Sequence, residues 1–258
     1  MTNNKYFLVP ACGGSGNSFI TCALSLSLFS RGEYKCLIVD ASHGFSFIDY
    51  LCCLDQDAVM AYDDFLEGNC ELDDIIYKTS IDNIDVLPSS TELTKPRRFK
   101  QLGKIIEFLS EYYDYVFIDT PSAPAACAMA KSTKNPKAII TTLPFPHAMT
   151  NCPQIVDLLY DNGFSDVRYI LNCFKKNLFF NNDLVQNIDE LTDYLKAQLL
   201  GVIPFDDYIS DIPLKRLYLK DILDDINSEN IKSKKSAIAE INRIACRLEG
   251  YENIFVKL

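Results

Sequence analysis

Short apolar runs alternate along this chain with longer segments in which apolar residues recur every three or four positions. The apolar runs predict buried strands at 5–9, 35–40, 84–87, 115–119, 137–143, 167–172 and 199–203. The periodic segments predict helices at 17–31, 58–67, 71–78, 99–112, 150–162, 184–197 and 233–248. We expect an irregular stretch at 41–54. This alternation indicates a mostly parallel, twisted sheet with helices on both faces.

The chain shows no internal division. Its 258 residues contain no linker, repeat or low-complexity segment, and 48% of them are apolar, which is enough for a full core. We therefore expect a single α/β domain over 1–258.

A glycine-rich turn joins the first predicted strand to the first predicted helix. Gly13, Gly14 and Gly16 allow the backbone to wrap a phosphate, and the following helix directs its positive end at the same place. The phosphate-binding pattern G-x-x-x-x-G-K-[ST] is met at Gly16 and Ser18, whereas Ala11 replaces its first glycine and Asn17 its lysine. The turn predicts a nucleotide-phosphate site. A tight turn without a ligand is the alternative.

Polar residues also stand at the carboxyl ends of other predicted strands. Asp40, Asp119 and Asn172 each end an apolar run. Ligands of such sheets bind beyond these strand ends, so we expect the three residues and the glycine turn to converge. Ser18 is placed to bind Mg²⁺ through its hydroxyl, and Asp119 to hold the ion through water.

Charge and cysteine content narrow the function classes. A net charge of −10 and a pI near 4.7 exclude a protein whose whole surface binds nucleic acid. A local group of basic residues is explained by a solvent-exposed loop and helix start, so we expect no specific nucleic-acid binding. The group consists of Lys95, Arg97, Arg98, Lys100 and Lys104. The ten cysteines form no C-x-x-C pair and lie mostly in apolar context, as in Cys22 and Cys36. With no secretion signal visible, we expect a cytoplasmic protein.

Several motifs occur in an order that resembles the MinD/ParA group of deviant P-loop ATPases. The loop C-G-G-S-G-N-S-F at 12–19 stands where that group has K-G-G-x-G-K-[ST]-[ST]. LIVDASHGFSFID and YDYVFIDTPSA resemble its two switch segments, and NIDVLPSS resembles a strand and loop of the group. LNCF and GVIPFDD resemble its adenine-contacting segments.

The resemblance implies a three-layer α/β/α P-loop NTPase fold that binds ATP or ADP with Mg²⁺. It assigns Asp40 a catalytic role, and Ser18 and Asp119 the metal. Adenine contacts are implied for Asn172, Pro204 and Phe205. The implied phosphate-binding residues are Gly13, Gly14, Ser15, Gly16, Asn17, Ser18 and Phe19. A homodimer is implied as well.

Three departures from the family pattern affect catalysis. Cys12 replaces the signature lysine, Asn17 the ordinary P-loop lysine, and Ser42 the second switch acid. One lost charged hydrogen bond costs about 10- to 150-fold in affinity, whereas a lost charge clamp in phosphoryl transfer costs roughly 10³–10⁵ in rate. We therefore expect binding to persist while hydrolysis is slow or absent. Lys35, Lys131 and Lys134 are candidates for a replacement cation.

A cysteine before the glycines and a missing P-loop lysine also resemble the TadZ/CpaE branch, which helps to localise Tad-type pilus assembly. Our first hypothesis is an ATP-stabilised switch or scaffold that positions or assembles a bacterial surface or division machinery through an unidentified protein partner. The alternatives are an ATPase that cycles between monomer and dimer, and a nucleotide-independent interaction protein. The last helix is expected to dock on the core. The weakly basic tail 251–258 predicts at most weak or indirect membrane contact.

Overall fold

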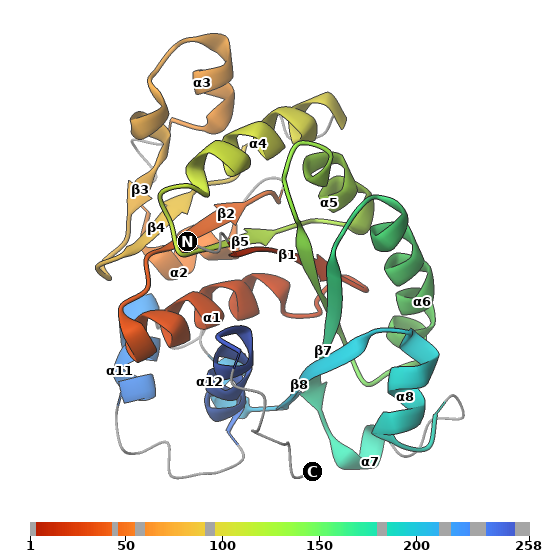
Figure 1. Ribbon diagram of the computed structural model, residues 1–258. Coiled ribbons are helices and arrows are strands. Elements are labelled where there is room, and N and C mark those ends of the chain that lie inside the picture. The colour runs from red at the N-terminus through yellow and green to blue at the C-terminus, as the bar shows by residue number, and fades with distance from the viewer. Residues whose placement is uncertain are drawn as a thin grey trace.

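One mostly parallel sheet organises the molecule in the computed structural model (Figure 1). The structure describes residues 4–42, 46–54, 60–90, 96–179, 185–211, 218–227 and 236–250. The eight strands lie in the order β3-β4-β2-β5-β1-β6-β7-β8, and within this sheet only β3 is antiparallel to its neighbour. Their bounds are β1 (Asn4–Pro10), β2 (Cys36–Asp40), β3 (Tyr77–Lys78), β4 (Ile84–Leu87), β5 (Tyr115–Asp119), β6 (Lys137–Thr142), β7 (Asp166–Phe174) and β8 (Gln198–Pro204).

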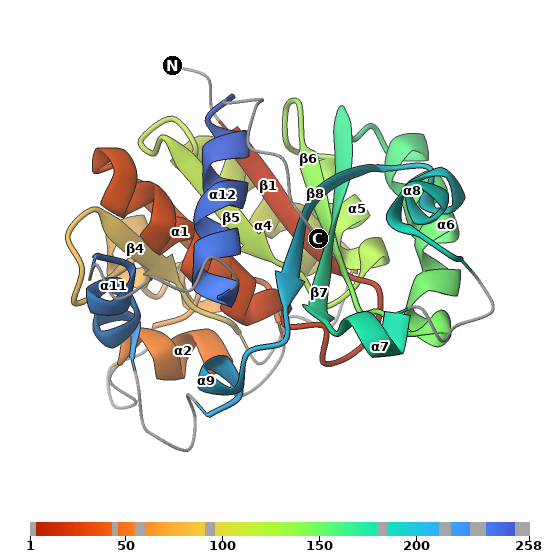
Figure 2. The ribbon, with the colours of Figure 1, turned by 90° about the horizontal axis from the view of Figure 1, so that it is seen from below.

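Helices cover both faces of the sheet, so the expected three-layer α/β/α class is confirmed (Figure 2). One face packs against α1 (Asn17–Gly32), α2 (Phe47–Cys52), α11 (Leu219–Asn227) and α12 (Ala237–Leu248). The other face packs against α4 (Pro96–Leu109), α5 (Ala123–Ala130), α6 (Pro146–Asp161) and α8 (Ile188–Leu195). Shorter turns complete the described chain: α3 (Tyr62–Glu67), the 3-10 helix η1 (Leu72–Ile75), α7 (Lys176–Phe179) and α9 (Asp207–Ser210).

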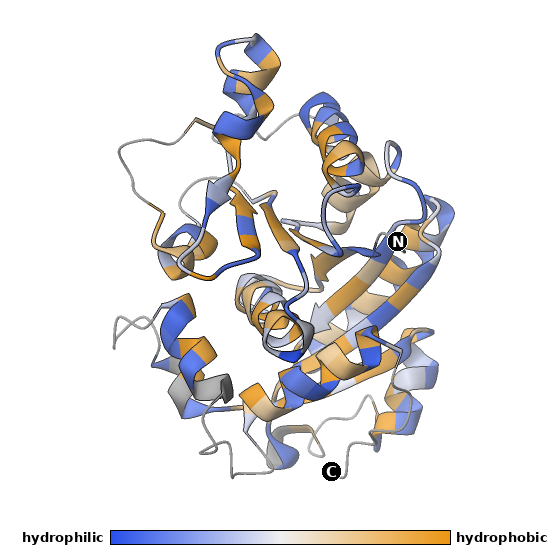
Figure 3. Cartoon of the chain, turned by 60° about the vertical axis from the view of Figure 1, so that its left-hand side comes forward, coloured by the Kyte–Doolittle hydropathy of each residue, from blue (hydrophilic) through white to orange (hydrophobic). Residues whose placement is uncertain are grey.

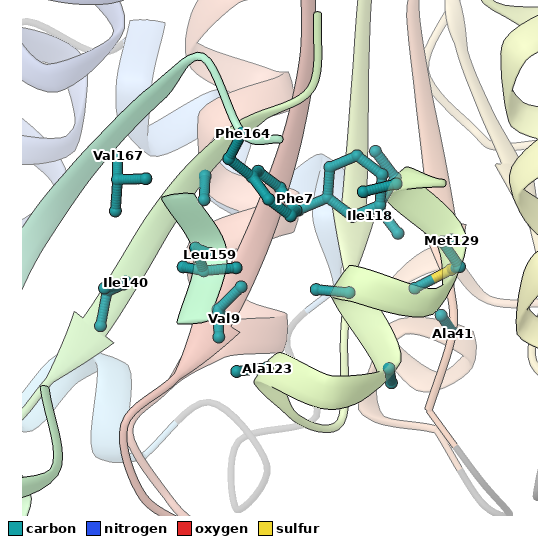
Figure 4. Packing of buried hydrophobic residues seen from close by; sticks show 14 of the residues in the cluster. Phe7, Val9, Ala41, Ile118, Ala123, Met129, Ile140, Leu159, Phe164 and Val167 are labelled. Carbon is teal, nitrogen blue, oxygen red and sulfur yellow. The ribbon is translucent and has the colours of Figure 1, made fainter. Parts of the chain in front are cut away.

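Strand β1 shows why its sequence is almost wholly apolar. Successive side chains point to opposite faces, and both faces are covered. Phe7 and Val9 enter the core under α5 and α6, where the Phe7 ring meets Phe164 edge-on at 5.3 Å between centroids (Figure 4). Tyr6 and Leu8 enter the core under α1. Coloured by hydropathy, the central strands are mostly apolar, while several outer helices show mixed faces (Figure 3).

Several stretches differ from the prediction, which also lacked α7, α9 and α11. Residues 71–78 were expected to be helical, but only η1 forms there, because Tyr77 and Lys78 pair antiparallel with β4. The stretch expected to be irregular contains α2, and α5 was not predicted. The sequence of α5, APAACAMA, lacks an apolar-polar period, and the helix begins where the Ser122 side chain accepts a hydrogen bond from the Ala125 backbone N–H.

The last helix docks on the core as expected. Helix α12 packs against α1 and β8, and its Glu240 carboxylate is buried between Arg243 and Arg247. Arg247 also donates a hydrogen bond to the Leu200 carbonyl of β8, at 2.5 Å. The tail 251–258 lies outside the described residues. Within the part of the chain that the structure describes, no helix combines the length and apolar character needed to cross a bilayer.

Candidate functional site

The glycine turn lies at the carboxyl edge of the sheet, between β1 and α1. Gly14 and Gly16 have φ angles of 75° and 85°, a left-handed conformation that favours glycine. A Cβ at Gly16 would also come within 2.4 Å of the Asn172 side-chain nitrogen. A Cβ at Gly14 would meet nothing within 4 Å. Gly16 is therefore fixed by packing and conformation, and Gly14 by conformation alone.

Helix α1 begins without a side-chain cap. Gly16 is its N-cap residue, so the N–H groups of the first turn donate no hydrogen bond to a capping side chain. Free N–H groups and the helix dipole together favour an anion at this position. The backbone therefore offers what a phosphate requires.

A cavity of about 350 Å³ opens beside this turn. Its lining residues are Pro10, Cys12, Gly13, Gly14, Ser15, Gly16, Asn17, Ser18, Phe19, Ser42, Phe47, Asp119, Thr120 and Pro121. None of these described lining residues is a lysine or an arginine, and Asp119 brings a carboxylate. A phosphate bound here would contact backbone N–H groups, and no lining residue would add a positive charge.

Asn17 occupies the lysine position of the motif, but its side chain turns into the sheet. Its Nδ2 donates to the Leu8 carbonyl at 2.9 Å and to Asp119 Oδ1 at 2.5 Å. Its Oδ1 accepts a hydrogen bond of 2.8 Å from Thr141 Oγ1, which lies 2.8 Å from Ser15 Oγ. The amide is thus engaged by β1, β5 and β6. Sequence reasoning missed this network, since Thr141 lies far along the chain.

Ser18 and Asp119 form the predicted hydroxyl-carboxylate pair. Ser18 Oγ donates to Asp119 Oδ2 at 2.5 Å. The strand register places Asp40 beside Asp119, and both are almost fully buried. Burial raises the pKa of Asp119 to about 7, the charge of Asp40 adds to this rise, and the hydrogen bonds from Ser18 and Asn17 oppose it.

The donor set fits a divalent cation. Hydroxyl and carboxylate oxygens are the ligands that Mg²⁺ prefers. Among the described residues neither Asp40 nor Asp119 has a salt bridge, so a cation would relieve their mutual repulsion.

Asp40 is tied to the start of α2. Its Oδ1 accepts a 2.8 Å hydrogen bond from the Ser42 backbone N–H, and its Oδ2 accepts one from Ser46 Oγ. Ser46 Oγ in turn caps α2 by accepting from Ile48 N–H at 3.0 Å. Burial raises the pKa of Asp40, while the bonds from Ser42 and Ser46 lower it. Ser46 was missed at the sequence level, although the pattern S-x-x-D that starts at Ser46 signals a helix start. Residues 43–45 lie outside the described chain.

The residues predicted to contact adenine lie on two neighbouring strand ends. Asn172 Nδ2 donates to the Ser15 carbonyl at 2.8 Å, which brings the end of β7 against the glycine turn. Pro204 ends β8 opposite Phe174, and the Phe205 N–H donates to the Phe174 carbonyl at 3.0 Å. The Phe205 side chain is partly exposed. Asn172 thus adjoins the loop, and its role toward a base stays a prediction.

The proposed replacement lysines are not at the site. Lys35 precedes β2 and places its Nζ 4.5 Å from the centroid of the Tyr113 ring. The Lys134 N–H donates to Glu107, which pairs with Lys5 near the start of β1. Lys131 follows the far end of α5. All three therefore lie toward the opposite edge of the sheet, and this prediction was wrong.

Comparisons with known proteins agree with this geometry. Residues 7–162 match the family model AAA_31, described as an AAA domain. The septum site-determining protein MinD of Synechocystis sp. is 26% identical over 199 residues, which are 76% of this chain and 74% of that protein. A chain of the MinC:MinD cell division protein complex of Aquifex aeolicus shares the fold, with a TM-score of 0.80, 22% identity and 99% of both chains covered. MinD of Pyrococcus horikoshii, solved with Mg-ADP, shares it with a TM-score of 0.75, 23% identity and 99% of both chains covered.

Proposed function

This chain belongs to the AAA_31 family of AAA domains. On that premise we propose that it is a P-loop ATPase of the MinD/ParA type, which binds ATP with Mg²⁺ and acts as a switch or scaffold with little or no hydrolysis. The observation that carries the proposal is the cavity beside the glycine turn. It combines an uncapped helix start and the Ser18–Asp119 pair with a lining that contains no lysine or arginine.

The residues in and around the cavity have distinct tasks in this proposal. The backbone of Gly13, Gly14 and Gly16 and the first turn of α1 bind the phosphates. Ser18 and Asp119 hold Mg²⁺, which supplies positive charge to the phosphates when bound. Asn172, Pro204 and Phe205 contact the base, and Asp40 is the acid nearest to Asp119 along the strand ends.

Slow turnover follows from the side chains that are missing. Phosphoryl transfer depends on cations that neutralise the charge of the transition state, and losing one such clamp costs on the order of 10³–10⁵ in rate. Cys12 and Asn17 stand at the two lysine positions, and the Asn17 amide is already engaged with the sheet. The nucleotide would then act mainly as a ligand that stabilises one state.

The wider role is positioning or assembly of a bacterial surface or division machinery. As the resemblance to the MinD/ParA group implies, the bound state would be a homodimer. It would recruit a protein partner, as the MinC:MinD complex of Aquifex aeolicus suggests, with membrane contact weak or made through that partner. The TadZ/CpaE-like loop suggests pilus assembly as the machinery. A cytoplasmic location is part of this proposal.

Calorimetry with ATP and ADP, each with and without Mg²⁺, followed by phosphate release from the same sample, tests the proposal. We expect Mg²⁺-dependent binding and release near background. Gly14→Val should abolish binding, because its φ of 75° strains a β-branched residue within the turn. Gly68→Val is the matched control, since Gly68 has φ 77° and equally open surroundings outside the site.

Other outcomes would contradict the proposal. Rapid phosphate release would support the cycling ATPase instead. Absence of any nucleotide binding would favour the nucleotide-independent interaction protein. One observation favours the nucleotide-independent interaction protein: hydrogen bonds among Asn17, Thr141 and Ser15 hold the loop through the chain's own side chains.

A further inference from the structure

A lysine stands at the end of β7 in an unusual contact. Lys175 follows Phe174 directly, between β7 and α7, and its Nζ lies 3.4 Å from the centroid of the Phe205 ring. The Phe205 backbone is held in turn by the Phe174 carbonyl. Figure 2 shows β7 ending at α7, with β8 beside it. The ammonium therefore rests on the ring predicted to contact a base.

No acid among the described residues neutralises the charge of Lys175. Among the described residues it forms no ion pair with a carboxylate, whereas Lys5, Lys78 and Lys196 each do. Of the described residues that directly follow the carboxyl end of a parallel strand, Lys175 is the one lysine or arginine. At the edge of the sheet that carries Asp40 and Asp119, the described residues thus give this cation an aromatic contact and no carboxylate.

Lys175 is close to the glycine turn along β7. Asn172 contacts the Ser15 carbonyl at 2.8 Å, and three residues of chain span at most about 11 Å. A lysine ammonium on its flexible four-carbon stem can move over part of that distance. Its present contact is exchangeable, because Phe205 is 37% exposed and an exposed cation–π contact is weaker than a charge-assisted hydrogen bond to phosphate.

We propose that Lys175 contacts a phosphate of the bound nucleotide and supplies the side-chain charge that the glycine loop lacks. In this structure Phe205 holds the ammonium. When a nucleoside di- or triphosphate binds, Lys175 leaves the ring for the phosphate, and the ring face becomes available to the base. This inference rests on the proposed function and adds one charge for binding the nucleotide, while Cys12 and Asn17 still occupy the two lysine positions on which phosphoryl transfer depends.

Calorimetry with Mg²⁺–ADP on Lys175→Met tests the inference. We expect affinity to fall by about 10- to 150-fold, the value of one charged hydrogen bond, and to be largely restored in Lys175→Arg. Lys176→Met, at the next position, should change affinity by less than about twofold because exposed charges contribute little. Binding of adenosine, which lacks a phosphate, should not weaken in Lys175→Met.

The outcomes separate the two proposals. If the wild-type protein fails to bind Mg²⁺–ADP, the proposed function falls and the inference falls with it. If wild type binds and Lys175→Met binds equally well or more tightly, the inference alone is overturned. Lys175 would then only shield the Phe205 ring. Equal losses in Lys175→Met and Lys176→Met would also overturn it, because they would indicate a general effect of charge.

Discussion

At the scale of single residues, Asn17 shows how a lost lysine is accommodated. Its amide is buried and bonded to Leu8, Asp119 and Thr141, so no polar atom of the side chain needs a phosphate. The substitution itself could be read from the sequence. The network could not, because it depends on strand β6, which is brought beside β1 only by the fold.

Thr141→Val should destabilise the protein by about 1–3 kcal/mol, because it leaves the buried Asn17 oxygen without its donor while keeping the side-chain shape. Urea unfolding measures the change. Thr142→Val is the control: Thr142 is the next residue of β6, is equally buried and takes no part in the Asn17 network. Equal costs for both variants would show that the network does not stabilise the loop.

At the scale of elements, α2 is joined to the site through one hydroxyl. Ser46 caps α2 and donates to Asp40, so the position of a carboxylate is coupled to the start of a helix. Sequence patterns located the longer strands and helices well, because there the spacing of apolar residues matches the positions that are buried in the fold. They failed at 71–78, where strand pairing with β4 decided the conformation, and at α5, whose alanines carry no period.

Ser46→Ala should cost about 1 kcal/mol for the lost cap, plus a further loss from the hydrogen bond to Asp40. Removing that donor raises the pKa of Asp40 further, so the additional loss should increase as the pH rises. Urea unfolding at several pH values measures it. Ser236→Ala, which removes the cap of α12, should show only the pH-independent part. Parallel pH profiles for the two variants would contradict the coupling.

At the scale of the whole molecule, the strands bring residues separated by most of the chain to one edge. The sequence predicted this convergence of the glycine turn, Asp40, Asp119 and Asn172 from the parallel topology alone. Hydrogen bonds among them confirm it for Asp119 and Asn172, and the strand register confirms it for Asp40. Distances among side chains, and the position of Lys175 over Phe205, needed the structure.

The stability of the metal-free fold should fall as the pH rises from about 4 to about 7. The pKa of Asp119 is raised from 3.8 to about 7, so the folded state binds one proton more than the unfolded chain between these values. Thermal unfolding in EDTA measures the trend, which should be reduced in Asp119→Asn. Mg²⁺ should stabilise the protein more above pH 7 than below it. A wild-type profile with the same slope as Asp119→Asn would contradict this assignment.

The hydrogen bonds that join Asn17 to three strands affect how a partner protein could recognise the nucleotide-bound form. We expect a loop that is held by hydrogen bonds of its own side chains to keep the same path when a nucleotide binds. The conformation of that loop would then not differ between the nucleotide-free and the nucleotide-bound protein. A partner that distinguishes the two forms must sense the ligand itself, the charge it brings, or segments outside the loop that move when it arrives.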